Sequence, residues 1–503
     1  MEASEKKVAE EPSKVKVDVP KNRKNAATKR LSFLAVLLAG ASLAIDYTMA
    51  MMSIQTLYYA LQGPDHLYGL TFGSYDLTGM IMAPFFGFWS DRTKTFKLPF
   101  ATGSAINVAG NLVYAFAYLA NGWWMMLLGR LLAGIGLATL GLGSGYIAKT
   151  TSLESRQMAL MYYRVSQSIA RMVGPFVGYI FLGLPSVSRS SSTALKVFNW
   201  YSIPGWLAAV VVALIGVLFW FLFTEPTIEN EHIVALPQDP NAPPPTEARK
   251  ARFRSFAIGW LTLTTVTFLI QFAVYSNLFA LFAGQFHAVT NQTDQWKVFI
   301  GVAIGAAAGA LVYRRGIRSF PDLFNERVLS LISSWLMFIV VMLFIPYHGS
   351  TDVPPEAIFY AGSGLMGAAI VIGSAAVETL FSKKITQYLD VVGNENVGRW
   401  LGIYYMATAA GRFAGPLIVG AVTRIATPSG DTNYCPAPGW IDTPDGPQCQ
   451  NTTNSCVITA STYYVQGCVL YNAIPFFSVM AGVQFVATII MHWVVKVHWS
   501  YTD

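Results

Sequence analysis

The chain has 503 residues, of which 53% are hydrophobic and only 12% are charged, and its mean hydropathy is +0.44. Soluble domains carry about 25% charged residues, so the composition argues against a soluble globular protein and predicts a polytopic membrane protein. The net charge of +7 comes from short basic segments between apolar runs. This placement indicates a solvated membrane face rather than a nucleic-acid-binding surface.

Twelve apolar runs are long enough to cross a bilayer, which takes about 20 residues. Polar segments separate them, and the polar linker at 225–254 divides them into two sets of six. We therefore predict an all-α membrane protein with six-helix halves at 31–224 and 255–495, between a basic tail at 1–30 and a tail at 496–503. The runs lie at 31–59, 68–89, 98–118, 123–147, 157–182, 203–223, 255–283, 295–313, 326–346, 356–381, 398–424 and 470–495.

The two halves contain a repeated motif. ARMVGPFVG at 170–178 resembles GRFAGPLIVG at 411–420, in the eleventh run. The matched pairs, 241 residues apart, are Arg171 with Arg412, Gly174 with Gly415, and Pro175 with Pro416. A repeat with the same topology in both copies is the parallel-repeat plan of the major facilitator superfamily. The Gly-Pro pairs predict either a helix that bends during transport or simply a close helix packing.

Lysine and arginine lie mainly on one side of the predicted helices, and only Arg189, Lys196 and Lys297 fall in segments on the other side. The positive-inside rule therefore predicts cytosolic N- and C-termini. The non-cytosolic side receives the segment 425–469 and the sequons at Asn291 and Asn451. We expect both asparagines to be glycosylated.

All four cysteines lie in this one non-cytosolic segment, and the predicted helices contain none. Four cysteines in one loop on the oxidising side predict two disulfides, with the pairing left open. The alternative is a zinc site, which the lack of any CxxC spacing disfavours. The residues are Cys435, Cys449, Cys456 and Cys468.

The segment after the second run, GFWSDRTKTFK at 87–97, resembles the loop signature of the same superfamily. Its physical role would be a latch. Asp91 can accept hydrogen bonds from the N-terminus of a neighbouring helix, while Arg92 and Lys97 pair with acidic or carbonyl groups when the cytosolic side is shut. The alternative is ordinary positive-inside charge, which would not require the aspartate.

Ionisable residues inside predicted spans are costly in a membrane and are therefore functional candidates. Asp46, Arg171 and Arg412 lie near the midplane by residue count. Two arginines related by the repeat would form a cationic pair suited to a carboxylate or phosphate. The alternative is that both arginines are structural and are neutralised by Asp46, Glu378 or backbone carbonyls. The complete set is Asp46, Asp76, Arg130, Arg164, Arg171, Glu378 and Arg412.

Five of these residues are predicted to serve substrate binding or coupling: Asp46, Arg130, Arg171, Glu378 and Arg412. Asp46 and Glu378 are the candidate proton carriers, since a carboxyl group can change its charge during transport. Arg130 is the second residue of GRLLAGIG (129–136), which resembles the Arg-xxx-Gly-x-Gly signature of the superfamily, a resemblance that implies a role in transport or proton coupling.

Five further stretches are distinctive in their order and spacing: SYDLTGMIMAPFFGFWSD (74–91), LLGRLLAGIG (127–136), TTSLESRQ (150–157), NERVLS (325–330) and GIYYMATAAGRFAGP (402–416). They resemble one branch, the major facilitator superfamily domain-containing protein 8 family of lysosomal ceroid-lipofuscinosis transporters. The resemblance implies a protein of an endolysosomal membrane that moves chloride or a small organic anion; the plasma membrane is the alternative location.

The sequence therefore predicts a secondary active transporter that moves a small anionic or carboxylated solute by alternating access, with protons or chloride as candidate coupling ions. The expected partners are this solute and the lipid bilayer, without nucleic acid. No phosphate-binding loop or HExxH motif occurs, so we expect no enzyme, cofactor or metal. The alternatives are a chloride-channel-like conductance on the same fold, a drug or sugar facilitator, and a non-transporting membrane receptor.

Overall fold

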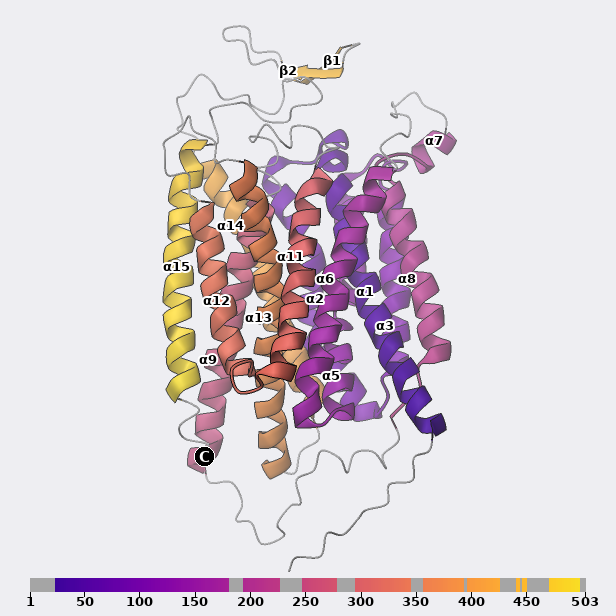
Figure 1. Cartoon of the computed structure of the whole chain (residues 1–503). Coiled ribbons are helices and arrows are strands. Elements are labelled where there is room, and N and C mark those ends of the chain that lie inside the picture. Colours follow the sequence, from indigo (N-terminus) through magenta and orange to yellow (C-terminus); the bar gives the residue numbers. More distant parts are fainter. Residues whose placement is uncertain are drawn as a thin grey trace, which may run out of the picture.

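The structure is a computed structural model that describes residues 23–180, 193–226, 247–277, 295–344, 356–392, 396–425, 440–443, 446–449 and 470–497. It is a bundle of long helices that run side by side (Figure 1). We call the end of the bundle at which α2 ends and α3 begins the lower end, because it lies at the bottom of Figure 1.

The N-terminal half contains α1 (Arg23–Ala60), α2 (Asp65–Thr93), α3 (Lys97–Ala115), α4 (Trp123–Leu137), α5 (Leu140–Thr150), α6 (Leu153–Ile180), α7 (Thr193–Val197) and α8 (Ile203–Leu222). The C-terminal half contains α9 (Glu247–Asn277), α11 (Gln295–Ser319), α12 (Glu326–Leu343), α13 (Glu356–Val392), α14 (Val397–Ile425) and α15 (Leu470–Val497). A short antiparallel hairpin of β1 (Trp440–Thr443) and β2 (Gly446–Cys449) lies between α14 and α15 in the chain.

The two halves pack in the same way. In the N-terminal half α1 contacts α6 and α8, and α4 contacts α2 and α3. The equivalent pairs recur in the C-terminal half, where α9 contacts α14 and α15, and α13 contacts α11 and α12. The halves meet where α2 lies along α14 and where α6 lies along α11 and α13. This arrangement confirms the predicted twelve-helix fold built from two six-helix repeats.

Three local features differ from the sequence prediction. The fourth span is broken into α4 and α5, because tight i→i+3 bonds such as Thr139 N to Gly136 O (3.0 Å) interrupt the helix in a glycine-rich stretch. The tenth span continues eleven residues beyond 381, to Val392, and Tyr388 in this extension stacks on Phe253 with ring centroids 3.6 Å apart. The short α7 and the β-hairpin were not predicted.

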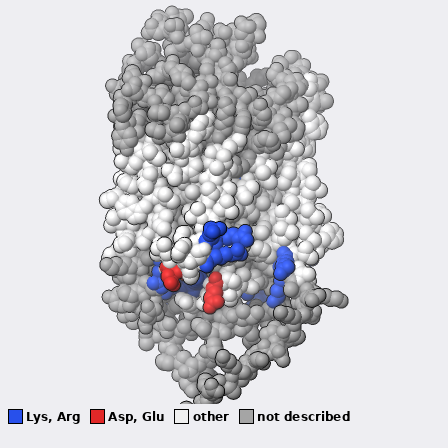
Figure 2. Space-filling view, viewed as in Figure 1, with Lys and Arg blue, Asp and Glu red and all other residues white. Residues whose placement is uncertain are grey.

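The outer surface of the bundle is apolar. On α8 and α15, large side chains such as Phe221 and Trp493 are 78% and 60% exposed. Such exposure fits contact with lipid, since soluble proteins rarely expose broad apolar faces. Figure 2 shows the same pattern on one face, where an uncharged band lies above a group of basic side chains. The exposed basic residues at the lower end of α11 are Arg314, Arg315 and Arg318.

By length and composition, seven of the described helical stretches are apolar enough to cross a membrane. Several other long helices carry the predicted intramembrane charges, such as Asp76 in α2 and Arg164 in α6. Both side chains are buried, so the bundle shields them from lipid. The predicted glycosylation sites and three of the cysteines lie outside the described residues, and only the backbone of Cys449 is described. Glycosylation and the disulfides therefore stay predictions.

Candidate functional site

A charged cluster occupies the interior of the N-terminal half. Asp46 on α1 accepts hydrogen bonds through Oδ2 from the Tyr75 hydroxyl and from Asn107 Nδ2, both at 2.8 Å. Arg130 Nη1 lies 3.9 Å from Asp46 Oδ1, and its guanidinium carbon stands 4.2 Å from the centroid of the Tyr75 ring. Asp46 is fully buried and Arg130 is 2% exposed. The cluster therefore joins four helices around one neutralised buried carboxylate.

The Arg-xxx-Gly-x-Gly motif explains how α4 comes so close to its neighbours. Gly134 faces the α2 backbone at Tyr75, and Gly136 faces α3. A Cβ atom at Gly136 would lie 2.5 Å from Asn107 Cβ and 2.7 Å from the Gly103 carbonyl oxygen. Only glycine permits this approach, which brings Arg130 within reach of Asp46.

A first ion pair connects the two halves. Arg412 on α14 donates through Nε to Asp76 Oδ1 on α2 at 2.6 Å. Both residues are buried, with exposures of 5% and 1%. The guanidinium also stands 5.9 Å from the Phe272 ring centroid. Within the described chain, Arg412 Nη2 has no hydrogen-bond partner, so this one nitrogen is available for a further acceptor.

A second ion pair also connects the two halves, but here the N-terminal half supplies the cation and the C-terminal half the carboxylate. Arg164 on α6 donates through Nε to Glu378 Oε2 on α13 at 2.6 Å. Its Nη1 donates to the Tyr405 hydroxyl on α14 at 2.7 Å. Arg164 Nη2 and Glu378 Oε1 have no partner among the residues that the structure describes. Each half therefore supplies a carboxylate to an arginine of the other half.

The two inter-half pairs are stacked along the interface. Tyr405 and Arg412 are seven residues apart on α14, which corresponds to two turns and about 10 Å on the same face. Arg164 and Tyr405 are themselves 241 residues apart, the separation that relates the two repeats. Two residues that are equivalent in the repeats and touch each other must lie close to the pseudo-twofold axis. The pair of Arg164 and Glu378, which is nearer the lower end, therefore marks this axis.

The structure corrects the counter-charges that the sequence predicts for the two repeated arginines, Arg171 and Arg412. Arg412 is neutralised by Asp76, not by Asp46 or Glu378, and the partner of Glu378 is Arg164. Arg171 is only partly buried. Counting residues along one helix gives depth but not lateral neighbours. For this reason the sequence identifies Asp76 and Arg164 as intramembrane charges but does not place them in the substrate or coupling site.

Polar residues without charge complete the site and were missed from the sequence. Tyr75, Asn107 and Tyr405 each bond directly to a buried charged group. The sequence contains one indication of the contact between Arg164 and Tyr405. The spacing of 241 residues that relates the repeats aligns Tyr163 with Tyr404 and, next to them, Arg164 with Tyr405. Pairing the aligned residues would have suggested this contact.

The repeated glycines allow equivalent helices to approach closely. A Cβ atom at Gly174 on α6 would lie 2.8 Å from Met49 N on α1, and one at Gly415 on α14 would lie 2.8 Å from Ala273 N on α9. Pro416 lies inside the continuous helix α14. The glycines of the repeated motif therefore fit the packing interpretation; whether the prolines also bend the helices during transport stays a prediction.

The lower end of the interface is closed by Asp91. As the sequence predicts, this carboxylate accepts hydrogen bonds from a helix N-terminus, from Gly398 N at 3.1 Å and from Arg399 N at 2.7 Å on α14. Lys149 Nζ on α5 donates to the same carboxylate at 3.0 Å. Asp91 thus ties α2 to the opposite half, and the positive end of the α14 dipole stabilises its charge.

The basic residues of this loop behave differently from the prediction. Arg92 is exposed. Lys97 Nζ stands 4.7 Å from the Trp220 ring centroid rather than against an acidic side chain. Instead Glu225, which follows α8, caps α3 by accepting from Phe96 N at 2.9 Å and Lys97 N at 2.7 Å. This cap fastens the loop to the N-terminal half.

Further bonds hold the lower end shut. Arg156 on α6 donates to the Thr386 hydroxyl at 2.8 Å and the Ser382 hydroxyl at 3.2 Å, both on α13. Gln157 Nε2 donates to the Phe324 carbonyl at 3.1 Å. All these bonds cross between the halves and join them at the lower end.

We expect Asp91→Ala to open the lower end, because it removes three hydrogen bonds to a charged group that are worth about 1.5–3 kcal/mol each. A buried thiol at Ser90→Cys, next to Gly398, should react with a maleimide at least about ten times faster in the Asp91→Ala background. Thr93→Ala changes an exposed position on the same helix and should leave the rate unchanged. Equal rates in all three backgrounds would refute the latch.

Comparisons with known proteins agree with this geometry. The family profile described as Major Facilitator Superfamily matches residues 36–416. Multidrug resistance protein 1 of Bacillus subtilis is 23% identical over 379 residues, which cover 73% of this chain and 83% of that protein. An SPX domain-containing membrane protein of Arabidopsis thaliana is 27% identical over 188 residues, but this match covers only 37% of this chain and 24% of the relative.

Solved structures show the same fold. The crystal structure of the human organic anion transporter MFSD10 (TETRAN) has a TM-score of 0.59 and 15% identity, covering 92% of this chain and 99% of that one. At this identity the likeness concerns the fold alone. The finer resemblance to the domain-containing protein 8 family stays a prediction. Since the family profile covers well over half of the residues, the chain belongs to the Major Facilitator Superfamily of membrane transporters for small-molecule solutes.

Proposed function

We propose that this protein is a secondary active carrier that moves a small carboxylated or otherwise anionic solute by alternating access. The observation that carries the proposal is the crossed pair of ion bridges, Arg412 with Asp76 and Arg164 with Glu378. Each arginine keeps an Nη2 group that has no partner within the described chain. Guanidinium is the side-chain group best suited to carboxylates, so a substrate carboxylate could accept a hydrogen bond from each of these Nη2 groups.

The protein's own carboxylates suggest how the carrier cycles. In this closed state Asp76 and Glu378 occupy the positions that a substrate carboxylate would compete for. An anion that reaches an arginine weakens its bond to the opposite half, and the halves can then rock apart. The displaced carboxylate would be left buried and unpaired, which is costly, unless it takes up a proton. Proton coupling through Glu378, whose Oε1 is already without a partner among the described residues, follows from this cost.

The name of the human structural neighbour, an organic anion transporter, supports an anionic substrate. The exposed arginines at the lower end of α11 support a cytosolic lower end under the positive-inside rule. We propose cytosolic termini, a linker at 225–254, a disulfide-bonded and glycosylated non-cytosolic side, and an endolysosomal membrane. These parts extend the proposal and do not carry it.

Reconstitution into proteoliposomes tests the function. A panel of labelled carboxylates, with radioactive chloride beside it, is offered for counterflow against the unlabelled anion. The proposal predicts saturable counterflow of at least one carboxylate, faster with an inward proton gradient. Currents too large for a turnover cycle would instead show a channel. If neither counterflow nor current occurred with any anion while uncharged drugs or sugars exchanged, the anion assignment would be wrong.

A further inference from the structure

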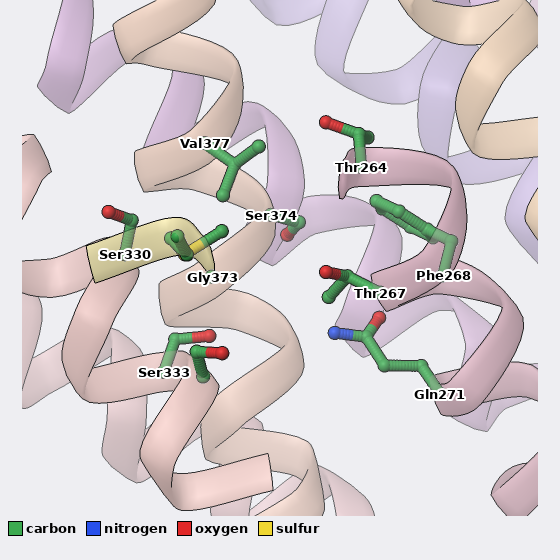
Figure 3. Close-up of a pocket in the computed structure, with 11 residues that line it drawn as sticks. Thr264, Thr267, Phe268, Gln271, Ser330, Ser333, Gly373, Ser374 and Val377 are labelled. Carbon is green, nitrogen blue, oxygen red and sulfur yellow. The ribbon is translucent and has the colours of Figure 1, made fainter. Parts of the chain in front are cut away.

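A small cavity lies inside the C-terminal half, away from the interface between the halves. It lies between α9, α12, α13 and α15 and has room for about one particle the size of a water molecule. Figure 3 shows the side chains of α9 facing those of α12 and α13 across it. The polar lining residues are Thr264, Thr267, Gln271, Ser330, Ser333, Ser334 and Ser374.

Five of the six hydroxyl groups that line this cavity present oxygen lone pairs, because their protons are used elsewhere. The sixth, Ser334, already accepts a hydrogen bond from Gln484 Nε2 at 3.1 Å. Those of Thr264 and Thr267 go to backbone carbonyls of α9 at 2.8 and 2.9 Å. Ser333 donates to the Ala369 carbonyl at 3.0 Å. Ser330 and Ser374 likewise donate to carbonyls of their own helices, at 2.7 and 3.4 Å. A hydroxyl oxygen retains acceptor capacity after it has donated, so the lining is rich in acceptors.

Gln271 adds an acceptor that has no partner. Its side chain extends from α9 toward Ser333, with the amide nitrogen nearer to Ser333 than the oxygen (Figure 3). The residue is 3% exposed, and its Oε1 makes no hydrogen bond within the part of the chain that the structure describes. A buried amide oxygen without a partner destabilises the folded protein. The lining thus combines a buried amide oxygen that has no hydrogen-bond partner with several hydroxyl oxygens, a set of groups that suits a donor or a cation.

The N-terminal half shows what stands in the equivalent place. Helices α1, α3 and α4 are the repeat counterparts of α9, α12 and α13, and they meet at Asp46, Asn107 and Arg130. There a protein cation, Arg130, lies at the centre of the polar cluster. In the C-terminal half the corresponding helices meet at the oxygen-lined cavity, whose described lining carries no arginine, lysine or carboxylate.

We propose that this cavity binds a single dehydrated monovalent cation, with Na⁺ as the first choice. Hard cations select oxygen ligands, and the space matches one small ion. A lining without carboxylates disfavours divalent cations, which need more negative charge. The ion would tie α9 to α13. Val377 in the lining precedes Glu378, and Phe268 in the lining packs against Gly411, which precedes Arg412, so the ion would stabilise the helices that carry the interface.

The test uses the purified full-length protein without substrate, which keeps it independent of the proposed anion transport. Thermal unfolding is followed in NaCl and in choline chloride at equal ionic strength. Na⁺ should raise Tm saturably by about 2 °C or more, and radioactive sodium should bind at about one ion per chain. The variants Ser333→Ala and Gln271→Leu should abolish both effects while unfolding at or near the wild-type Tm in choline.

Ser363→Ala is the matched control. Ser363 is also buried on α13 and also donates to a carbonyl of its own helix, at 3.0 Å, but it does not line the cavity. It should retain the full sodium response. Equal Tm values in NaCl and choline chloride for the wild type would mean that the cavity holds water only and would overturn the proposal. A sodium response that survives in both Ser333→Ala and Gln271→Leu would also overturn it.

Discussion

The double variant Arg412→Gln/Asp76→Asn is expected to fold and to lose at least about 100-fold of the counterflow of a carboxylated solute. Removing both charges leaves no buried ion without a partner, so the folded state survives. The anion, however, loses its guanidinium anchor, and a buried charge-assisted contact of about 3 kcal/mol corresponds to roughly a hundredfold in rate. Counterflow in proteoliposomes measures the loss, and Tm in detergent reports on folding.

The double variant separates a site role from a structural one. If Arg412 only stabilised the fold, neutralising it together with Asp76 would leave transport intact, whereas the single variant Arg412→Gln would strand a buried carboxylate and lower Tm. The matched control is Glu326→Gln/Lys383→Gln, which neutralises a pair of similar length, 3.0 Å, within the C-terminal half. This control should transport normally. Normal counterflow in Arg412→Gln/Asp76→Asn would remove Arg412 from the anion site.

The variant Glu378→Gln should keep anion exchange but lose accumulation driven by a proton gradient. Glutamine has nearly the shape of a protonated glutamic acid and can still accept a hydrogen bond from Arg164, yet it cannot take up or release a proton. The variant leaves the buried Arg164 guanidinium without its counter-charge, so Tm should fall as it does in Arg412→Gln. Exchange at equal pH on both sides should remain within about threefold of wild type, while gradient-driven uptake should fall by at least about tenfold, to the level seen without a gradient.

A carboxyl group outside the interface provides the comparison. Glu326 bonds to Lys383 near the lower end of the C-terminal half, and Glu326→Gln should retain uptake driven by a proton gradient. Two results would count against Glu378 as the proton carrier. One is normal gradient-driven accumulation in Glu378→Gln, and the other is equal loss of coupling in Glu326→Gln.

Much of the fold was predictable because a membrane imposes length and polarity on each helix. The twelve predicted spans correspond to the observed helices, with α4 and α5 together forming the fourth. The errors have local causes. Apolar periodicity cannot locate the break before Leu140, where tight turns replace α-helical bonds, and it underestimates α13, whose lower end is stabilised by bonds such as Arg156 to Thr386 across the interface.

The site was predictable only in part. Asp91 was assigned correctly to a helix N-terminus, because a lone carboxylate in a basic loop has few other partners. The partner of Arg412 was not, because Asp76 approaches it from a helix 336 residues away in the chain. Which charged residues pair across the interface depends on how the two halves dock. Many weak packing contacts determine the docking, such as that of Gly402 with the α2 backbone, and no single sequence motif encodes it.

The most direct test of the account is whether an anion bound at the crossed arginines moves the halves apart. Spin labels at Thr93 on α2 and Arg315 on α11, both exposed at the lower end in opposite halves, would report their separation with and without the best-transported carboxylate. We predict that the anion at acidic pH shifts part of the population to a longer distance in the wild type and has no effect in Arg412→Gln/Asp76→Asn. A full response in the double variant, or a single unchanging distance in the wild type, would contradict the account.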